Sequence, residues 1–362
     1  MNLLKITKRD NLNKKQEIII RTLAILLSIV CAGLILVIFG LNPVNVFKAI
    51  VEGALGTDLR IKQTIIKAVP LVITSLGILV AFKMRFWNIG GEGQIVIGAM
   101  AAAFIALNID GVPKPVMLLL MAVAAMIAGG LWAFIPAIFK AKMGTNETIF
   151  TLMMNYIGIK FVTYLQYGPW MDPNANGFPK VAPFPESALL PSVLGVHAGW
   201  IIAVLCTILI FFLMKYTKLG YEINVVGESY ETARYAGMNI NKIIIVTMMI
   251  SGGLCGLVGM IQASAIEKTL VAGISGGYGF TAIITAWLAR LNAVATLFVC
   301  VIFAMLIQGG AYIQLAMNVP SAVASVVQGT ILFFVLGSEF FLQYKVSIAH
   351  KFSNKHAEKE VA

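Results

Sequence analysis

Long runs of apolar residues, separated by short polar segments, occupy most of the chain. A helix that crosses about 30 Å of hydrocarbon needs roughly 20 apolar residues. The last run, 291–338, carries no formal charge and is long enough for two helices that turn near Asn318-Val319-Pro320. The pattern therefore predicts an all-α, polytopic membrane bundle of about ten transmembrane helices. The earlier runs are 22–40, 68–82, 93–109, 115–139, 148–167, 199–214, 243–266 and 280–289.

The composition excludes several classes of protein. Hydrophobic residues make up 59% of the 362 residues and charged residues only 12%, about half the usual globular share. Charge this sparse cannot cover a water-facing surface, which excludes a soluble enzyme, a disordered chain and a disulfide scaffold. The cysteines lie inside apolar runs and are expected to be buried free thiols; they are Cys31, Cys206, Cys255 and Cys300.

The basic residues predict the orientation in the membrane. If Met1 lies in the cytoplasm and the helices alternate, most of the 27 lysines and arginines fall on the cytoplasmic side, as the positive-inside rule requires. Their spread over many short loops excludes a nucleic-acid surface. We expect a multi-pass membrane protein with both termini in the cytoplasm. It would have an N-terminal tail (1–21), a transmembrane domain (22–344) and a polar C-terminal tail (345–362), disordered beside the lipid.

Three polar stretches lie between the apolar runs. Segment 41–62 is mildly amphipathic and is predicted to lie at the outer membrane interface. Segment 169–198 is rich in proline and is predicted to be a stiff extracellular loop, which either covers helix ends or docks an external binding protein. Segment 215–242 is the longest polar segment predicted on the cytoplasmic side.

The cytoplasmic segment carries signals for a short helix. Ser229 is a good N-cap residue and Gly237 a good C′ residue, so 230–236 is expected to form about two helical turns. Asn241 is expected to cap the next membrane helix. A helix this short is marginal alone and needs neighbouring helices or a partner. The segment is therefore either a solvated connector or a docking site for another subunit.

Three glycines in four positions open the third apolar run, with polar side chains among them. A carboxylate at membrane depth costs roughly 3 kcal/mol, and irregular backbone survives there only where it is buried in protein or lines a cavity. One interpretation is a polar solute path. In the other, Glu92 sits at the cytoplasmic interface beside Lys83 and Arg85 and pins the helix end. The residues assigned to the path here are Asn88, Gly90, Gly91, Glu92 and Gln94.

A second glycine-rich segment, 273–279, leads the eighth predicted helix, with Phe280 at its start. Each glycine-rich segment precedes the third helix of a block of five, and the two blocks run in opposite directions. This pattern is typical of an inverted repeat of two five-helix halves, with a solute site where the halves meet. We assign Phe280 to the same path.

The fifth apolar run begins with Asn146 and Glu147. Asn146 is suited to capping the helix and Glu147 to complementing its dipole, and both are candidates for a gating role. Asn155 lies two turns later and needs a hydrogen-bond partner, either a neighbouring helix or a solute. We include Asn155 in the predicted path.

Several sequence motifs are missing from the chain. It contains no GxxxxGK(S/T) phosphate-binding loop, so no ATP site is expected. It also contains no HExxH or GxSxG motif and no Cys/His cluster. We therefore expect no catalytic residues, no metal site and no cofactor bound by this chain.

Three motifs together resemble the permease subunits of bacterial ABC importers for sugars, nucleosides and branched-chain amino acids, and the nucleoside branch most. They are FWNIGGEGQIVIGA (Phe86–Ala99), GTNETIFTLMMNYI (Gly144–Ile157) and GESYETARYAGMN (Gly227–Asn239), with weaker support from Gly277–Ile283. One departure follows the last of these. The family usually continues with small apolar residues, whereas this chain has Trp287.

The resemblance implies a transport subunit, not an enzyme. Its partners would be an ABC ATPase subunit, which uses ATP and Mg, a second and related permease in a heterodimer, and an extracellular substrate-binding lipoprotein. The implied function is translocation of nucleosides by alternating access. The resemblance also assigns coupling to the ATPase to Glu228, Ser229, Glu231, Thr232, Ala233, Arg234, Tyr235 and Gly237.

Three alternatives stay open on the sequence alone. A permease for ribose-like sugars in the same class would share these motifs. An ion-coupled secondary carrier would use Glu92 or Glu147 as its proton or sodium site. A membrane scaffold would leave both glycine-rich segments without a role.

Overall fold

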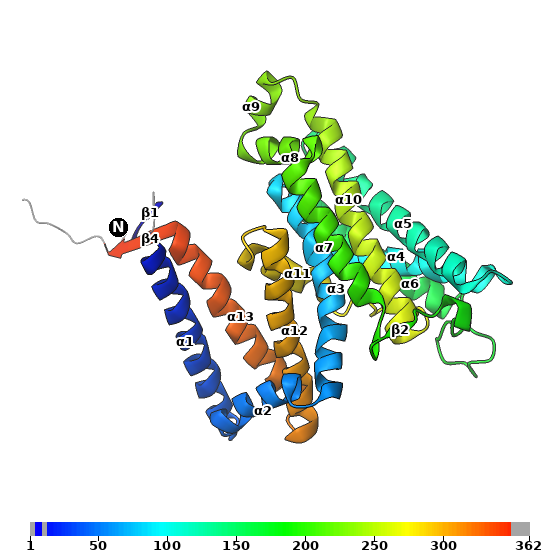
Figure 1. The fold of residues 1–362 in the computed structure, drawn as a ribbon, viewed down its shortest axis with the longest axis horizontal. Coiled ribbons are helices and arrows are strands. Elements are labelled where there is room, and N and C mark those ends of the chain that lie inside the picture. The colour runs from blue at the N-terminus through cyan, green and yellow to red at the C-terminus, as the bar shows by residue number, and fades with distance from the viewer. Residues whose placement is uncertain (1–3, 9–12, 349–362) are drawn as a thin grey trace, which may run out of the picture. The chain divides into compact units, whose positions relative to one another are not determined.

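The computed structural model describes residues 4–8 and 13–348, and these residues form helices almost throughout (Figure 1). Nine helices in the described part are long and apolar enough to cross a membrane, and α11 is a shorter apolar helix. The predicted all-α bundle of about ten membrane helices is therefore confirmed. The helices are α1 Lys14–Ile38, α2 Pro43–Leu55, α3 Asp58–Lys83, α4 Gly91–Asn108, α5 Lys114–Met143, α6 Glu147–Tyr167, α7 Gly199–Tyr216, α8 Lys218–Glu228, α9 Tyr230–Tyr235, α10 Ile240–Ile261 with a π-helical extension Gln262–Glu267, α11 Tyr278–Leu288, α12 Ala293–Ala316 and α13 Ser321–Gln343.

The chain divides into two compact units, and the smaller one joins the two ends of the chain. It contains α1, α13 and a two-stranded antiparallel sheet of β1 (Leu4–Lys8) and β4 (Tyr344–Ile348), in which Leu4 lies opposite Ile348. Because β1 leads into α1 and α13 leads into β4, the two helices run antiparallel, and an even number of crossings is expected. The prediction of a disordered C-terminal tail is wrong for 345–348. Residues 349–362 lie outside the described part.

The larger unit, residues 48–318, is built around α3 and α10, which contact each other. α4 and α5 pack on α10, whereas α11 and α12 pack on α3. The third and fourth helices of each predicted half therefore contact the second helix of the other half. This exchange is the pattern that an inverted repeat produces.

Small residues allow α4, α5 and α10 to approach closely. Gly98 of α4 and Gly129 of α5 both lie against the backbone of Gly256, so closely that a Cβ atom on either glycine would overlap it. Without a hydrophobic force between helices in lipid, such close backbone packing is a main source of association. The glycines of α10 therefore serve close packing between helices.

The helix α3 begins ten residues before the predicted run. Thr57 caps it, with its Oγ1 accepting a hydrogen bond from the backbone N–H of Arg60 at 3.3 Å. Lys67, which directly precedes the predicted run, consequently lies inside the helix. The predicted interfacial segment, 41–62, is divided between α2 and the first turn of α3.

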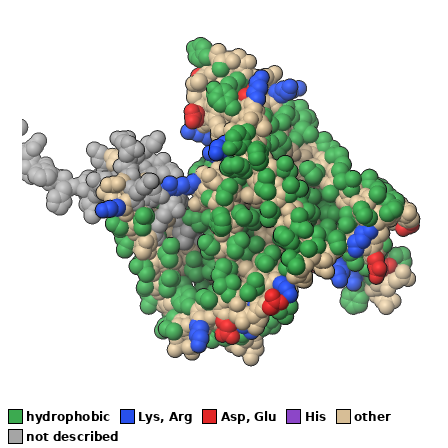
Figure 2. Space-filling view, viewed as in Figure 1, with side chains coloured by type: hydrophobic (Ala, Val, Ile, Leu, Met, Phe, Trp, Pro, Cys, Tyr) green, Lys and Arg blue, Asp and Glu red, His purple; other side chains and the backbone are tan. Residues whose placement is uncertain are grey.

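Apolar side chains dominate the sides of the helices in the larger unit, and charged ones gather around α8 and α9 and near other helix ends (Figure 2). α5 and α6 contribute many of the exposed apolar side chains, among them Leu119, Ile127, Ile149 and Tyr164. This distribution is typical of a surface that faces lipid or another membrane subunit. All four cysteines are free thiols, as predicted, and Cys206, Cys255 and Cys300 are buried; the prediction of burial is wrong for Cys31, which is half-buried.

Candidate functional site

The two glycine-rich segments meet inside the larger unit. The Glu92 carboxylate, in the first turn of α4, accepts hydrogen bonds at Oε1 from the backbone N–H of Gly279 at 2.6 Å and of Phe280 at 3.4 Å. Gly91 lies beside Gly279, and a Cβ on Gly91 would be 3.3 Å from the Gly279 Cα. The N-termini of α4 and α11, from opposite halves, are therefore joined through one carboxylate. We call this contact the glycine junction.

Glu92 caps a helix of the other half. Its side chain is buried, at 3% exposure, and among the described residues neither Lys83 nor Arg85 pairs with it. Lys83 and Arg85 are therefore not the partners of Glu92, and the interpretation that placed Glu92 beside these two cations is wrong on this point. The unsatisfied N–H groups and the positive dipole end of α11 compensate the negative charge instead.

Buried amides hold the segment that precedes α4. Asn88 and Gln94 exchange two hydrogen bonds: Asn88 Nδ2 donates to Gln94 Oε1 at 3.2 Å, and Gln94 Nε2 donates to Asn88 Oδ1 at 3.1 Å. Asn88 Oδ1 also accepts from the Gly90 N–H at 3.0 Å, and Asn88 Nδ2 donates to Ser251 of α10 at 2.9 Å. The two amides thus attach an irregular backbone segment to α10.

The same segment is held from its other side by α6. Asn155 Oδ1 accepts from the Gly93 N–H at 2.8 Å, and its Nδ2 donates to the Ile89 carbonyl at 2.8 Å. The Ile89 N–H donates to Thr151 Oγ1 at 3.1 Å. The partner that Asn155 required is therefore a neighbouring backbone. Thr151 was not among the residues predicted from the sequence, although it lies one turn before Asn155 on the same helix face.

The predicted path residues are therefore brought together, and Phe280 is the exposed one among their side chains, at 46%. The amide and carboxylate groups of Asn88, Glu92, Gln94 and Asn155 all bond to protein groups. In this conformation they fix the backbone at the junction. Contact of any of them with a solute stays a prediction.

An aromatic recess lies between the end of α3, the link to α4 and the last turn of α11. The rings of Phe82, Trp87 and Trp287 contact one another, with centroids 5.2 Å apart for Phe82–Trp87, 6.0 Å for Phe82–Trp287 and 5.6 Å for Trp87–Trp287. With Arg85 and Phe86 they line a cavity of about 150 Å³. The sequence offered one signal for it, the departure from the family pattern at Trp287.

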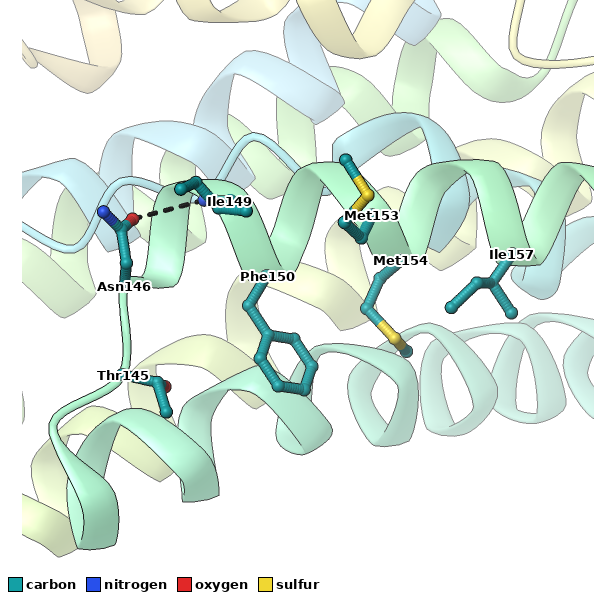
Figure 3. A pocket seen from close by; sticks show the side chains of 7 residues that line it. All are labelled: Thr145, Asn146, Ile149, Phe150, Met153, Met154 and Ile157. Atoms are coloured by element: carbon teal, nitrogen blue, oxygen red, sulfur yellow. Dashed lines mark hydrogen bonds between the residues drawn. The ribbon is translucent and has the colours of Figure 1, made fainter.

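The start of α6 matches its predicted capping. Asn146 Oδ1 accepts from the N–H groups of Thr148 at 3.1 Å and Ile149 at 3.2 Å, and Glu147 forms an ion pair with Lys140 at 2.8 Å. Figure 3 shows the cap from close by. An apolar recess of about 430 Å³ runs along this helix, with no charged side chain in its lining of Thr145, Asn146, Ile149, Phe150, Met153, Met154 and Ile157.

The polar segment 215–242, predicted to be cytoplasmic, contains two short helices, α8 and α9. Ser229 Oγ accepts from the Thr232 N–H at 3.2 Å, which confirms the predicted N-cap. At the other end, Gly237 has φ +72°, and the N–H of Met238 donates to the carbonyl of Ala233, which together make a Schellman motif. The prediction for Asn241 is wrong, because Asn239 caps α10 by accepting from the Lys242 N–H at 3.1 Å.

The helix α9 presents a polar surface and a buried anchor. Ala233 is fully buried, whereas Tyr235 is 91% exposed. Six of the residues assigned to coupling are exposed, and Glu231 lies 3.8 Å from Arg234; the six are Glu228, Glu231, Thr232, Arg234, Tyr235 and Gly237. We call this exposed set the α9 surface.

The α8–α9 segment rests on the helices that lead to the glycine junction. Gly227 lies against the backbone of Lys83, at the end of α3 and five residues before Asn88. Tyr230 lies close to Lys140 and Glu147, at the ends of α5 and α6. Burial raises the pKa of the Tyr230 hydroxyl, Glu147 adds to this rise and Lys140 opposes it, so the phenol stays protonated. The segment therefore touches the end of α3, which leads into the link before α4, and lies near the start of α6, whose Asn155 holds that link.

Comparison with known proteins decides the family. Residues 60–336 match the family described as branched-chain amino acid transport system / permease component. The chain belongs to this permease family.

The permease also has similar relatives over most of its length. A glucose ABC transporter permease protein of Haloferax volcanii is 33% identical over 90% of this chain and 89% of its own. A guanosine ABC transporter permease protein of Bacillus subtilis is 31% identical over 89% of this chain and 94% of its own. A nucleoside ABC transporter permease protein of Lactococcus lactis is 29% identical over 89% and 92%. The resemblance inferred from the motifs is confirmed.

The proline-rich segment of the permease covers one end of α10. The Phe184 N–H donates to the Lys268 carbonyl at 2.9 Å, and Ser264 Oγ donates to the Ala188 carbonyl at 2.6 Å. The segment contains a short 3-10 helix, η1 (Glu186–Ala188), and a small hairpin of β2 (Ser192–Val193) and β3 (Val196–His197). Its role as a cover for helix ends is confirmed, and docking of a binding protein stays a prediction.

Proposed function

We propose that this chain is the membrane-spanning permease subunit of an ABC importer that moves nucleosides into a bacterial cell. One observation carries the proposal: α8, which leads into the exposed α9, packs on the end of α3 at Lys83, and the chain segment that follows leads into α4 and its contact with α11 at the glycine junction. A partner that pushes on α9 would change how the two halves meet, which is what alternating access requires.

The partner on the α9 surface would be an ABC ATPase subunit. The sequence of this chain has no phosphate-binding loop, so the energy of ATP would reach it mechanically. With α9 facing the ATPase, both termini of the chain would be cytoplasmic. The proline-rich cover would then face outside and receive the substrate-binding lipoprotein.

A second, related permease would complete the path. Two relatives from Bacillus subtilis support a pair of different chains: both are named guanosine ABC transporter permease proteins, and the second, NupQ, is 30% identical over 62% of this chain and 72% of its own. The exposed apolar sides of α5 and α6 offer surfaces for such a subunit or for lipid.

The identity of the solute is the most specific part of the proposal. Two of the three relatives compared above are named for guanosine or nucleoside transport, which favours a nucleoside. The relative from Haloferax volcanii is named for glucose, which keeps a sugar, such as ribose or glucose, as the second candidate.

An ion-coupled secondary carrier is less well supported. It would need Glu92 or Glu147 to bind and release a cation during transport. The Glu92 carboxylate is bonded to the backbone of α11, and Glu147 is paired with Lys140. Both acids already have structural partners.

The experiment is uptake by the complete transporter in liposomes, with both permeases, the ATPase and the binding protein. Labelled guanosine, adenosine, ribose and glucose would be supplied separately with ATP inside. Accumulation of nucleosides but not of free sugars is expected. Accumulation of ribose or glucose without nucleosides would replace the nucleoside proposal with the sugar one.

A further inference from the structure

The recess of Phe82, Trp87 and Trp287 combines chain segments from both halves of the permease. Phe82 lies in the last turn of α3, Trp87 in the link between α3 and α4, and Trp287 in the last turn of α11. The indole rings of Trp87 and Trp287 are stacked, with 29° between their planes. Trp87 keeps 44% of its surface exposed, and Trp287 is half-buried, so aromatic surface from two halves is left available.

The chemistry of the recess is that of a site for a flat ring. Its lining is aromatic except for Arg85, which is exposed and has no acidic partner within residues 13–348. Nucleobases stack on aromatic side chains through their π faces, whereas an arginine fork donates two parallel hydrogen bonds to a pair of acceptors such as O6 and N7 of guanine. The cavity of about 150 Å³ is smaller than pockets that enclose whole ligands, roughly 300–1,000 Å³, so it fits a base and leaves a ribose outside.

The backbone at Arg85 shows that the side chain is held at this place at a conformational cost. Arg85 has φ +58°, a left-handed conformation at the C-terminal end of α3 that glycine adopts far more readily. The Arg85 N–H donates to the Phe82 carbonyl at 2.9 Å, and the next N–H, of Phe86, donates to the Ala81 carbonyl at 3.2 Å. A glycine would close the same helix end, so the local fold does not require the guanidinium.

We propose that the recess of Phe82, Trp87 and Trp287 binds the base of a purine nucleoside during transport, with Arg85 donating to a 6-oxo purine. This binding site rests on the proposed nucleoside function, and it specifies where the nucleoside binds and which kind of base it carries. Trp87 directly precedes Asn88, whose amide attaches the segment to α10. A base in the recess therefore contacts residues on both sides of the glycine junction, and relative movement of the halves would release it.

Binding of labelled guanosine and adenosine is measured on the complete membrane complex of both permeases and the ATPase in nanodiscs, without the binding protein. Trp287→Ala is expected to weaken guanosine binding roughly 5- to 100-fold, the range that stacking on one aromatic ring supplies, and Trp287→Phe to keep most of it. Arg85→Gly keeps the left-handed backbone and is expected to remove the preference for guanosine over adenosine.

Trp170→Ala is the matched control, because Trp170 stacks on Phe104, at a centroid distance of 6.2 Å, outside the recess. It is expected to leave guanosine affinity unchanged, and the melting temperature of each variant complex shows whether it folds. Unchanged guanosine binding in a folded Trp287→Ala complex that still transports guanosine would overturn this inference alone. Binding of ribose or glucose with the same dependence on Trp287 would overturn the base as the occupant. A wild-type complex that takes up no nucleoside would overturn the proposed function as well.

Discussion

The carboxylate of Glu92 lies 2.6 Å from the backbone nitrogen of Gly279, although 187 positions separate the two residues in the chain. This one contact joins the first turn of α4 to the first turn of α11, and so one half of the permease to the other. It combines a glycine on one side, where a Cβ would overlap the Glu92 backbone, with a hydrogen-bond acceptor on the other. The first two predictions test these two features separately.

Glu92→Ala is expected to destabilise the junction, and Glu92→Gln to destabilise it less. Alanine leaves the N–H groups of Gly279 and Phe280 without an acceptor, at a cost of about 1–3 kcal/mol, whereas glutamine keeps a carbonyl oxygen there. Thermal unfolding of the purified chain in detergent measures both variants. An ion-coupled carrier would give the reverse pattern, with Glu92→Gln fully stable but inactive in transport.

Gly279→Ala is expected to disrupt the junction, whereas Gly273→Ala should be tolerated. A Cβ on Gly279 would lie 2.5 Å from the Glu92 backbone nitrogen, closer than atoms of that kind approach. Gly273 lies in the same glycine-rich segment, has no atom within 4 Å of the corresponding position and does not have positive φ. The melting temperature and the uptake rate should fall for the first variant alone. Equal behaviour of the two would show that the close approach is not needed.

On the α9 surface, Tyr235→Ala and Glu231→Lys are expected to stop transport and leave the fold intact. Tyr235 is 91% exposed, and the Glu231–Arg234 pair is exposed too, so their loss costs little stability. In the complete complex, uptake should become weak, and any remaining ATP hydrolysis should no longer drive uptake. The melting temperature of the permease should be unchanged.

Ala233 is the contrasting position in the same helix. It is fully buried, so a bulky residue there has to displace α9, and both folding and transport should suffer. If Tyr235→Ala and Glu231→Lys transported normally, the α9 surface would not be the docking site.

The pH dependence of stability should show a contribution from His197. Burial lowers the pKa of this imidazole, whose Nδ1 accepts a hydrogen bond from the Gly199 N–H at 3.2 Å. Because the folded state binds the proton less readily than the unfolded chain, where the pKa is about 6.5, the stability is complete above that pH and is lost as the pH falls below it. The charged groups that line the same cleft are Lys114, Glu186 and Lys268.

Melting temperatures between pH 7.5 and 5.5 check the His197 prediction. The wild-type value should be level at the upper end and decline below about pH 6.5. His197→Asn retains an oxygen that accepts from the Gly199 N–H and carries no proton equilibrium in this range, so its decline should be smaller. An identical decline in both chains would assign the effect to other groups.

The sequence predicted the parts of this fold that depend on neighbours along the chain. The apolar runs gave the membrane helices, and Ser229, Gly237 and Asn146 were identified as caps because capping uses residues three or four positions apart. The start of α3 was missed because its first turns carry Asp58, Arg60 and Lys62, which interrupt the apolar window. Asn239 and Asn241 are both suitable caps for α10 by residue type. The structure shows that the helix begins after Asn239, whose side chain forms the capping hydrogen bond.

The site was predicted less completely, for a physical reason. The residue types at the junction indicated buried polar groups. The partner of Glu92, however, is a backbone N–H in the opposite half. Every residue except proline has such an N–H, so the sequence cannot indicate which one is used. The contacts of Asn155 with Gly93 and Ile89 are of the same kind. The aromatic recess depends on Phe82 and Trp287, which are 205 positions apart in the chain. Only the packing of α11 on α3 brings these two residues together.

The most direct test of the account is uphill uptake of a nucleoside into liposomes, measured with and without the ATPase subunit. Labelled guanosine should accumulate above its outside concentration only when the two permeases, the ATPase, the binding protein and ATP are all present. It should not accumulate with this chain alone under any imposed proton or sodium gradient. Gradient-driven accumulation by the purified chain without the ATPase would contradict the account.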